Sequence, residues 1–566
     1  MLKITKIFNL QFIIFISAIV YSIKYHLINF ISKISKENSF NVNSNIFANY
    51  LKKNSNFWKN ENKSLSKSRI LITNFVHHPG YTITESIIAK QISQLYNLET
   101  SALLNYNDYI GKKIIKSFDV NNFLFQPQIT FIDRFRYLLE AYNLIIKTKN
   151  IQEFISMNKN NINYGRCIYD HILRNTSSGT IKKINFRIYF FLAEALFYNK
   201  FYNNLFSSNK FEFMIMSETQ FLPSNIVFQN ALENNVKVIS RIGGPEKIGI
   251  RLYTLSNEKF QSNIKILKNQ FDQTIKGSEE FISNKGFEYI TELYEGRKKK
   301  HDQATSHNFN HKDDEFNSSK LLEYFKWNKS KKICVIYSHN LFDGNYYNEW
   351  RIFKDNLTWL RKTLLFIKNN KNNINWIVKD HPSDYGINRG KTTTHKEFQN
   401  IIGENKNIKF FPKNFQAKIL KEISNCLLTS QGSAGIEFPC FGIPSVICGD
   451  AFYQGLGFTL EPKNENEYYN IIENIDKIID EGLDENQINN ARAAFCFSEE
   501  LTKIEHMLLF DYNISRSKLD LDDFFFKATK KIVNYDEKKD LFKSSLKNQL
   551  LSNNRHLIIE NNLVKI

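Results

Sequence analysis

The fold is decided by two pieces of sequence, Ile377-Val378-Lys379-Asp380-His381-Pro382 and Leu427-Leu428-Thr429-Ser430-Gln431-Gly432-Ser433-Ala434-Gly435-Ile436-Glu437, which lie within the stretch Trp376–Thr459. Each piece is a short apolar run that ends abruptly in small or polar residues. This pattern is typical of a buried parallel strand whose carboxyl end opens into a ligand-binding loop. We therefore expect a parallel sheet with a ligand site at the ends of these two strands.

The second piece also predicts a phosphate site. Gly432 and Ser433 lead into a helix-like segment, 434–438, and the run 442–448 then predicts another strand. A Ser/Gly turn at a helix N-terminus offers backbone N–H groups and the positive end of the helix dipole. Such a place suits a phosphate group.

Length and composition limit the class of protein. A chain of 566 residues is too long for one core and predicts about two to four domains. With 42% hydrophobic and 14% aromatic residues the chain is globular. The formal net charge is +19, but the lysines are scattered and form no arginine-rich stripe or nucleic-acid motif. We therefore expect no nucleic acid as a partner, and the charge favours a membrane surface or an anionic substrate.

The cysteines indicate a reducing compartment and no metal site. None of them forms a Cys-x-x-Cys pair or has the spacing of metal ligands, and several lie inside apolar runs, where a thiol acts as a small core residue. A reducing cytosol fits this usage best. The six are Cys167, Cys334, Cys426, Cys440, Cys448 and Cys496.

The N-terminus is apolar. Residues 7–23 carry no charge and are flanked by lysines, and as a helix they would extend about 25 Å, slightly less than the ~30 Å hydrocarbon core of a bilayer. No cleavage site for a signal peptide follows. Two readings stay open for residues 1–36: a helix lying on the protein or on a membrane surface, and a single-span anchor. Residues 37–68, rich in Asn, Ser and Lys, are expected to be a linker.

The first domain is expected to be a doubly wound α/β domain over residues 69–295. An apolar run, 70–76, predicts a strand that ends in the loop His77-His78-Pro79-Gly80. Thr82 and Glu85 have the spacing of a capping box, so they place a helix start here. Another strand, helix and strand are predicted at 211–217, 225–233 and 236–240.

The remainder divides into a linker, a second domain and a tail. Residues 296–331 are polar and are expected to link two domains, and their irregularly spaced histidines do not favour a metal site. Residues 332–514 repeat the strand and helix pattern, beginning with a strand at 333–337 and a long amphipathic helix through 350–367. Residues 515–566 are expected to be a helical, basic tail.

Three runs, 377–382, 427–437 and 449–459, resemble the bacterial capsule polysaccharide biosynthesis and surface-carbohydrate glycosyltransferases, a family that includes relatives of the Kdo transferases. The resemblance extends to His339 and Asp343, and over about residues 70–500. It implies a GT-B architecture: two Rossmann-like domains facing a cleft, with a nucleotide-sugar bound by the C-terminal domain.

Leaving-group chemistry and this resemblance together give a predicted site. Negative charge develops on the departing phosphate, and fixed donors must stabilise it. We expect His381, Ser430 and Ser433 to supply donors, together with the helix that follows Gly432. Lys379 would add charge if it points into the site, and Glu437 would accept from ribose hydroxyls or else only stabilise its helix. The family motifs add Gly435, Tyr453, His339 and Asp343 to the donor-binding residues.

The acceptor's base is less determined by the sequence. His77, His78 and Glu218 each follow a strand of the first domain, where a side chain would face a ligand, but each is also explained as an ordinary loop residue. The site runs contain no Asp-x-Asp motif, so we expect neither a metal nor a cofactor, and the nucleotide-sugar is a co-substrate.

Three functions are compatible with these observations. The first is transfer of a sugar, with a CMP-linked donor among the candidates, to a surface or capsular polysaccharide or its lipid-linked acceptor. The second is transfer of a polyol phosphate of the teichoic-acid type, and the third is a non-catalytic membrane-associated scaffold. The expected partners are a nucleotide-sugar, a glycan or glycolipid, and the inner-membrane surface at its cytoplasmic face.

Overall fold

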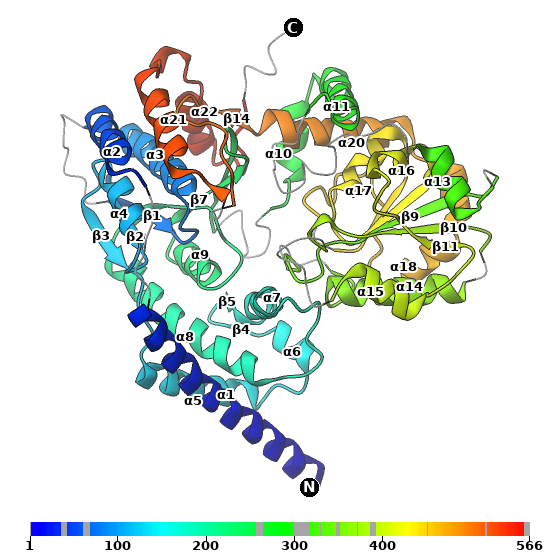
Figure 1. The fold of residues 1–566 in the computed structure, drawn as a ribbon, viewed down its shortest axis with the longest axis horizontal. Coiled ribbons are helices and arrows are strands. Elements are labelled where there is room, and N and C mark those ends of the chain that lie inside the picture. Colours follow the sequence, from blue (N-terminus) through cyan, green and yellow to red (C-terminus); the bar gives the residue numbers. More distant parts are fainter. Residues whose placement is uncertain are drawn as a thin grey trace. The chain divides into compact units, whose positions relative to one another are not determined.

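The computed structural model describes residues 2–35, 42–59, 68–255, 264–298 and 317–559, apart from 329, 347–350, 371, 385–391, 450 and 516–517. The chain forms two compact units (Figure 1). The N-terminal unit comprises Met1–Ile172, Ile181–Phe260 and Ile504–Leu557, and the C-terminal unit comprises Leu173–Thr180, Gln261–Lys503 and Ile558–Ile566. Two α/β units were expected, but the boundaries 69–295 and 332–514 differ from these, because both units are assembled from separated segments.

The N-terminal unit contains a seven-stranded sheet in the order β14-β8-β7-β6-β1-β2-β3. The five strands from β7 to β3 are parallel, and β8 and β14 are antiparallel additions. From β1 the order runs outward in both directions, so the switch point of this sheet lies at β1. The strands are β1 (Arg69–Asn74), β2 (Glu99–Leu104), β3 (Asn122–Phe125), β6 (Phe211–Met216), β7 (Lys237–Gly243), β8 (Lys247–Tyr253) and β14 (Ile504–Glu505), and β4 (Asn158–Lys159) and β5 (Ile162–Asn163) form a separate pair.

The helix after β1 begins earlier than the capping-box pattern predicts. It is α3 (Pro79–Tyr96), and the side chain of His78 caps it by accepting from the Gly80 amide at 3.1 Å. Glu85 therefore lies inside the helix, fully buried, and does not reach back to a cap. The remaining helices between β1 and β8 are α4 (Tyr109–Lys116), α5 (Phe131–Ile145), α6 (Ile151–Ile155), α7 (Tyr164–Thr176), α8 (Phe186–Ser208) and α9 (Ser224–Glu233).

The apolar N-terminus forms one long helix, α1 (Leu2–Ser35), which runs along α5 and α8 (Figure 1). Phe15 is buried with its ring centroid 4.8 Å from that of Tyr142, and Tyr21 contacts Phe190 at 5.0 Å. The opposite side of α1 is exposed. A search of the described residues for a helix with the length and hydropathy of a membrane span finds none.

Two regions expected to lie outside the domains belong to the N-terminal unit. The expected linker 37–68 contains α2 (Ser44–Trp58), and Phe47 of this helix lies 4.6 Å from Phe525, centroid to centroid. The tail is helical, as expected, with α21 (Leu521–Val533) and α22 (Phe542–Ser552). Their apolar faces are buried, so these segments complete a core.

The C-terminal unit contains a five-stranded parallel sheet in the order β11-β10-β9-β12-β13. Its strands are β9 (Ile333–Tyr337), β10 (Asn375–Lys379), β11 (Ile408–Phe410), β12 (Cys426–Thr429) and β13 (Ser445–Ile447). Successive side chains of a strand point to opposite faces. On β9, Cys334 and Ile336 join one apolar cluster with Trp359, while Ile333 and Val335 join another with Phe325.

Helices cover both faces of this sheet, with α14, α15 and α18 on one side and α13, α16 and α17 on the other (Figure 1). The residues 318–325, expected within a linker, form α13 and bury Leu321 and Phe325 against the sheet. The linker histidines His301, His307 and His311 lie outside the described residues. The covering elements are α13 (Ser318–Phe325), α14 (Asn356–Asn369), α15 (Thr394–Ile401), α16 (Leu420–Ile423), α17 (Ala434–Glu437), α18 (Glu465–Glu473) and α19 (Ile475–Glu481), with short 3₁₀ turns η2 (Pro382–Asp384), η3 (Ala417–Ile419) and η4 (Pro439–Phe441).

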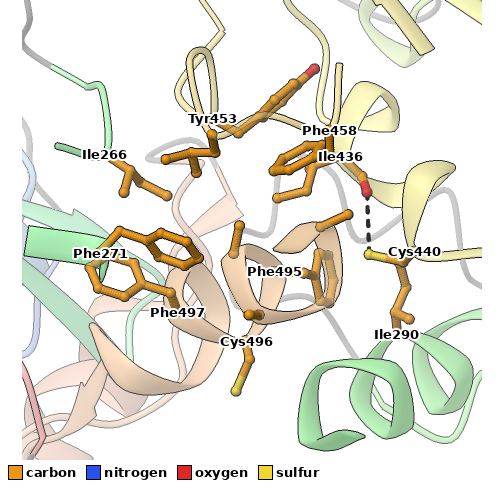
Figure 2. Close-up of a cluster of buried hydrophobic side chains, with 14 of the residues drawn as sticks. Ile266, Phe271, Ile290, Ile436, Cys440, Tyr453, Phe458, Phe495, Cys496 and Phe497 are labelled. Carbon is orange, nitrogen blue, oxygen red and sulfur yellow. Dashed lines mark hydrogen bonds between the residues drawn. The ribbon is translucent and has the colours of Figure 1, made fainter. Parts of the chain in front are cut away.

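A third cluster connects the predicted ligand turn to helices from elsewhere in the chain (Figure 2). Ile436 and Tyr453 pack there with Phe271 of α10 (Lys268–Ile275), Ile290 of α11 (Glu279–Tyr294) and Phe495 of α20 (Glu485–Cys496). The Cys440 thiol lies 3.3 Å from the carbonyl oxygen of Ile436. The turn after β12 is therefore held from behind by α10, α11 and α20, of which α10 and α11 were expected to belong to the first domain.

Candidate functional site

Two histidines lie at the carboxyl ends of neighbouring strands in the C-terminal sheet. His339 follows β9 and His381 follows β10, and their ring centroids are 5.7 Å apart. Both residues are partly exposed, yet burial lowers the pKa of His339 to about 4 and that of His381 to about 3. Both rings are therefore neutral at pH 7. The predicted His381 thus lies at the carboxyl end of β10, beside the ring of His339.

Arg351 supplies positive charge beside these rings. Its guanidinium donates to Gln431 Oε1 at 2.9 Å and to Asn356 Oδ1 at 2.8 Å, and it also contacts the Asn345 carbonyl oxygen. Ser430 is fully buried and donates to the same Asn356 oxygen at 2.9 Å, and Arg351 approaches its hydroxyl at 3.4 Å. Ser430 is thus a support of the arginine. Arg351 lies in no sequence motif and was not predicted.

Asn356 joins the arginine to the histidine. This first residue of α14 directs its amide nitrogen to His339 Nδ1 at 3.2 Å and to the Asn340 carbonyl oxygen at 3.0 Å. Since the same side chain accepts from Arg351 and Ser430, one buried amide fixes three polar groups at the strand ends.

Lys379, which was expected to add charge if it points into the site, is buried. Its Nζ donates to the Asp380 carbonyl oxygen at 3.0 Å and lies 5.2 Å from the Tyr337 ring centroid. Burial lowers its pKa, against the attraction of Asp380, Glu437 and Asp384. Burial also raises the pKa of Asp380 to about 6. An anion arriving here would be favoured by the lysine, since it would replace part of the water that the ammonium has lost.

The turn 430–437 differs from the expected phosphate loop. The Gly432 amide donates to Thr429 Oγ1 at 3.2 Å, and Ser433 donates to Glu437 Oε1 at 2.9 Å. The second carboxylate oxygen of Glu437 accepts from Tyr294 at 3.0 Å. Glu437 therefore has a partner on each oxygen and holds α17 to α11. The helix α17 has only one turn.

Tyr453 and Gly435 form the rear of this turn. The buried Tyr453 hydroxyl donates to the Gly432 carbonyl oxygen at 2.5 Å. A Cβ on Gly435 would lie 2.0 Å from that hydroxyl oxygen, so only glycine fits. Both residues were expected to bind a donor, and in the structure they shape the backbone of the turn. Asp343, the last of the residues expected to bind the donor, pairs with Arg174 of the same unit.

The N-terminal sheet presents a second polar edge, at its switch point. His77 follows β1, and its Nδ1 lies 3.1 Å from Asp108 Oδ2, an oxygen that also accepts from Asn74 at 2.7 Å. Its Nε2 contacts the Asn105 amide nitrogen. The backbone of His77 has φ +54°, an uncommon conformation for a residue other than glycine and one found at functional sites.

The other two base candidates occupy different environments. His78 is buried, caps α3 and stacks on Tyr512 with centroids 5.3 Å apart. It is therefore part of the packing at the start of α3. Glu218 follows β6 and accepts from the Gln220 amide at 2.7 Å, which closes a local turn. Of the three candidates, His77 alone combines a carboxylate partner with an edge position and partial exposure, its side chain being 25% exposed.

Glu85 is a titratable group that sequence analysis treated only as a cap. Its carboxyl group is buried beside Ser217 at the end of β6, and burial raises its pKa to about 8 in spite of Ser217 and Arg241. The guanidinium of Arg241 lies 4.4 Å over the Tyr81 ring. This carboxyl group is protonated at pH 7.

One Asp-x-Asp triplet does occur outside the site runs, at Asp520-Leu521-Asp522. Asp520 caps α21 by accepting from the amides of Asp522 and Asp523, and Asp522 accepts from the Asn43 amide at 2.8 Å. The triplet therefore serves the start of a helix.

Comparisons with known proteins give no match to a protein-family model and none to a curated protein. Solved structures do match. A UDP-GlcNAc 2-epimerase from Neisseria meningitidis bound to UDP-GlcNAc is 10% identical, covering 76% of this chain and 97% of that one, with a TM-score of 0.25. A β-Kdo 2,4 transferase, KpsC of Thermosulfurimonas dismutans, is 10% identical, covering 58% and 93%, with a TM-score of 0.31.

The wall teichoic acid polymerase TagF is also similar, at 10% identity, covering 91% of this chain and 99% of that one, with a TM-score of 0.22. The structures that this chain resembles thus include transferases of the group that its sequence motifs resemble, and nucleotide-sugar epimerases. These identities and TM-scores are low, so the fold of this chain is defined by its own sheets, and its chemistry by its own side chains.

Proposed function

We propose that this protein is a glycosyltransferase that moves a sugar from a nucleotide-activated donor, with CMP-linked sugars among the candidates, to a surface or capsular polysaccharide or its lipid-linked acceptor. The observation that carries the proposal is the arrangement at the carboxyl edge of the C-terminal sheet. There, two neutral imidazoles, a buried lysine and a hydrogen-bonded arginine gather at the ends of three adjacent parallel strands. Ligands bind at this edge of such sheets.

Each group has a role in stabilising a departing phosphate without a metal. Arg351 and Lys379 supply charge, while His381 and His339 donate hydrogen bonds as neutral rings. Because the donors are already held by Asn356 and Gln431, they need little reorganisation as charge develops. Arg351 acts mainly through its charge, because its N–H groups already donate to the carbonyl oxygens of Asn345 and Phe353 and to the side chains of Gln431, Asn356 and Ser430.

For the acceptor we propose His77 as the base. The Asp108 carboxylate fixes one ring nitrogen, and the other, which contacts the Asn105 amide nitrogen, receives the hydroxyl proton when the acceptor takes the place of that amide. His78 and Glu218 are assigned to packing and turn formation, since each already has a local structural partner.

We further propose that the protein works on the cytoplasmic face of the inner membrane, with α1 lying on the lipid surface. Ile13, Val20 and Leu27 of α1 are 61%, 60% and 58% exposed. Ile132 of the adjacent α5 is 78% exposed, and a ring contact of 5.9 Å between His26 and Phe131 places the start of α5 beside this part of α1. Adjoining exposed apolar faces of this kind favour an interfacial helix.

Vesicle flotation tests the membrane proposal. The full-length protein should float with vesicles of phosphatidylglycerol and phosphatidylethanolamine, and the Ile13→Ser/Val20→Ser variant should stay in the soluble fraction. Val533→Ser/Leu551→Ser, at positions 63% and 67% exposed elsewhere in the unit, is the matched control and should float normally. Equal flotation of the α1 variant would refute the proposal.

A donor screen tests the transferase. Nucleotides and nucleotide-sugars are added at increasing concentration, and the melting temperature is recorded. A ligand at 100 times its Kd stabilises the folded state by about 2.7 kcal/mol. The best ligand is then incubated with the protein and a cell-envelope acceptor fraction, and the product is analysed. A glycosylated product supports the proposal, a polyol-phosphate product identifies the alternative reaction, and no nucleotide release with any donor contradicts both.

A further inference from the structure

The carboxyl edge of the N-terminal sheet exposes an unusual group of aromatic side chains. Tyr106 and Tyr109 are 65% and 64% exposed, and Phe125, the last residue of β3, is 38% exposed. The rings of Tyr106 and Phe125 are 5.8 Å apart, centroid to centroid, and nearly edge to face. Lys112 Nζ lies 5.5 Å from the Phe125 ring centroid. Exposed aromatic groups beside polar side chains mark ligand-binding surfaces.

These rings belong to the same loop that holds His77. Asn105 and Asp108 both contact the imidazole, and Tyr106 and Tyr109 are the residues that directly follow them. The loop connects β2 to α4, and Asp108 is the N-cap of α4, accepting from the Gly111 amide at 2.8 Å. The position of the aromatic rings is thus tied to that of the histidine by a capped helix.

The hydrogen bonds around His77 define which nitrogen carries the proton. Asp108 is a carboxylate and can only accept, so the Nδ1 that faces it at 3.1 Å must be the donor. Nε2 then holds the lone pair, and the Asn105 amide nitrogen donates to it. The amide hydrogen occupies the position in which an acceptor hydroxyl would present its proton.

A sugar fits both halves of this surface. A pyranose has an apolar C–H face that stacks on a flat aromatic ring, and hydroxyls at its rim that donate and accept hydrogen bonds. The exposed rings offer the first kind of contact, and His77, Asn105 and Lys112 offer the second. A phosphate would find one flexible lysine here, and a protein partner would have to cover aromatic rings mixed with titratable groups.

We propose that Tyr106, Tyr109 and Phe125 form a subsite that binds one sugar of the acceptor glycan and places its reacting hydroxyl at His77 Nε2, with Asp108 as the positioning residue for the imidazole. The inference rests on the proposed function and names its acceptor as a saccharide. In the reaction, Nε2 takes the hydroxyl proton, the freed oxygen bonds to the donor's anomeric carbon, and that carbon's bond to phosphate breaks with both electrons leaving on the phosphate.

Sugar binding is tested on the full-length protein by saturation-transfer NMR. The probes are methyl β-D-glucopyranoside, methyl β-D-galactopyranoside and Kdo at millimolar concentration, without any donor. At least one probe should receive saturation through its ring C–H protons, and Tyr106→Ala/Tyr109→Ala should abolish the signal. Tyr324→Ala is the matched control, because Tyr324 is 63% exposed in the other unit. An unchanged signal in the double variant, or no signal from any probe, overturns the subsite.

The positioning role is tested by the ¹⁵N chemical shifts of His77. The intact protein should show the tautomer protonated at Nδ1, and Asp108→Asn should give a mixture, since one amide oxygen replaces two carboxylate oxygens that accept three hydrogen bonds. Asparagine also caps helices well, so the fold should persist. A wild-type ring protonated at Nε2 overturns the assignment. Neither measurement uses a nucleotide, so these results and the donor screen can fail independently.

Discussion

The carboxyl edges of the two sheets have opposite chemical character. In the C-terminal unit the edge is largely buried: its histidines are neutral, and its arginine and lysine are held by hydrogen bonds, with the carboxyl groups of Asp380, Asp384 and Glu437 near the lysine. In the N-terminal unit the edge has a partly exposed histidine that is held by a carboxylate and lies in the same loop region as exposed aromatic rings. The first edge suits stabilisation of an anion, and the second suits removal of a proton from a neutral ligand.

We expect the substitution of His381 to have the largest effect on turnover. Replacing it with alanine removes a donor that acts most strongly as charge develops, so turnover should fall about 100-fold or more, or about 3 kcal/mol in activation free energy. His381→Asn retains a neutral donor and should recover part of the loss. Turnover and melting temperature are measured on the same preparations.

The matched control is His395→Ala, at an exposed histidine of the same unit. Its turnover should equal that of the wild type. Normal turnover in folded His381→Ala protein would break the assignment of the C-terminal edge as the anion site.

The N-terminal unit also contains a buried group that is neutral at pH 7, the carboxyl group of Glu85, and the pH dependence of stability tests it. Its folded pKa of about 8 lies above the unfolded value near 4.5, so the folded state holds an extra proton between these pH values, and stability falls as pH rises through this window. Between pH 5 and 7 the fall should be about 2.7 kcal/mol. Glu85→Gln should remove it.

Urea unfolding of wild type and Glu85→Gln at pH 5 and pH 7 checks this expectation, with the difference between the proteins isolating the one group. Parallel pH dependence in the two proteins would mean that the carboxyl group is charged in the folded state.

For His339 and His381, which follow strands β9 and β10, stability changes with pH in the opposite direction. Their folded pKa values lie below the unfolded value near 6.5, so the unfolded chain binds protons first as pH falls, and stability decreases below pH 6.5. Each ring should cost about 2 kcal/mol between pH 7 and pH 5. Asp380, with its pKa raised to about 6, offsets part of this change below pH 6.

His339→Asn/His381→Asn should flatten this dependence. Tryptophan fluorescence is a suitable probe, since four of the five tryptophans, at 327, 350, 359 and 376, lie in the C-terminal unit. A double variant that loses as much stability as wild type on acidification would show that the two rings titrate in the folded state as they do in the unfolded chain.

The smallest expected effect concerns Arg351. Arg351→Lys keeps the charge but loses the planar set of donors that contacts Gln431 and Asn356, and the affinity for the donor nucleotide should fall about tenfold, or about 1.4 kcal/mol. Titration calorimetry with the best nucleotide of the screen measures it. Arg361→Lys, at an arginine that pairs with Glu397 away from the strand ends, should bind normally. Equal losses in both variants would exclude a specific role for Arg351.

The parts of the site that sequence analysis could predict are those with local signals. His381 and Lys379 follow an apolar run that breaks abruptly, and His77 follows another, so their places at strand ends could be read directly. Arg351 contacts Gln431, 80 residues away, and Tyr294 contacts Glu437, 143 residues away. Nothing in the neighbouring sequence indicates such partners.

The same limit explains the errors in the fold. Strands were predicted in both sheets, because apolar periodicity is local, but in the N-terminal sheet only β1, β6 and β7 were predicted, and β2, β3, β8 and β14 were missed. The helix α2 was taken as linker because its polar composition conceals the two aromatic residues, Phe47 and Tyr50, that pack on Phe525. The unit boundaries depend on packing between segments hundreds of residues apart, which periodicity does not report.

The placement of residues 504–557 in the N-terminal unit has a consequence for synthesis. The N-terminal unit lacks an edge strand, two helices and the Tyr512 ring that covers His78 until the end of the chain is made. At about 5–20 residues per second, the ribosome needs roughly 15–60 s to pass from residue 260 to residue 557. During this interval the ribosome makes most of the C-terminal unit, while the N-terminal unit is still incomplete. The core of the N-terminal unit can therefore be completed only after most of the C-terminal unit has been made.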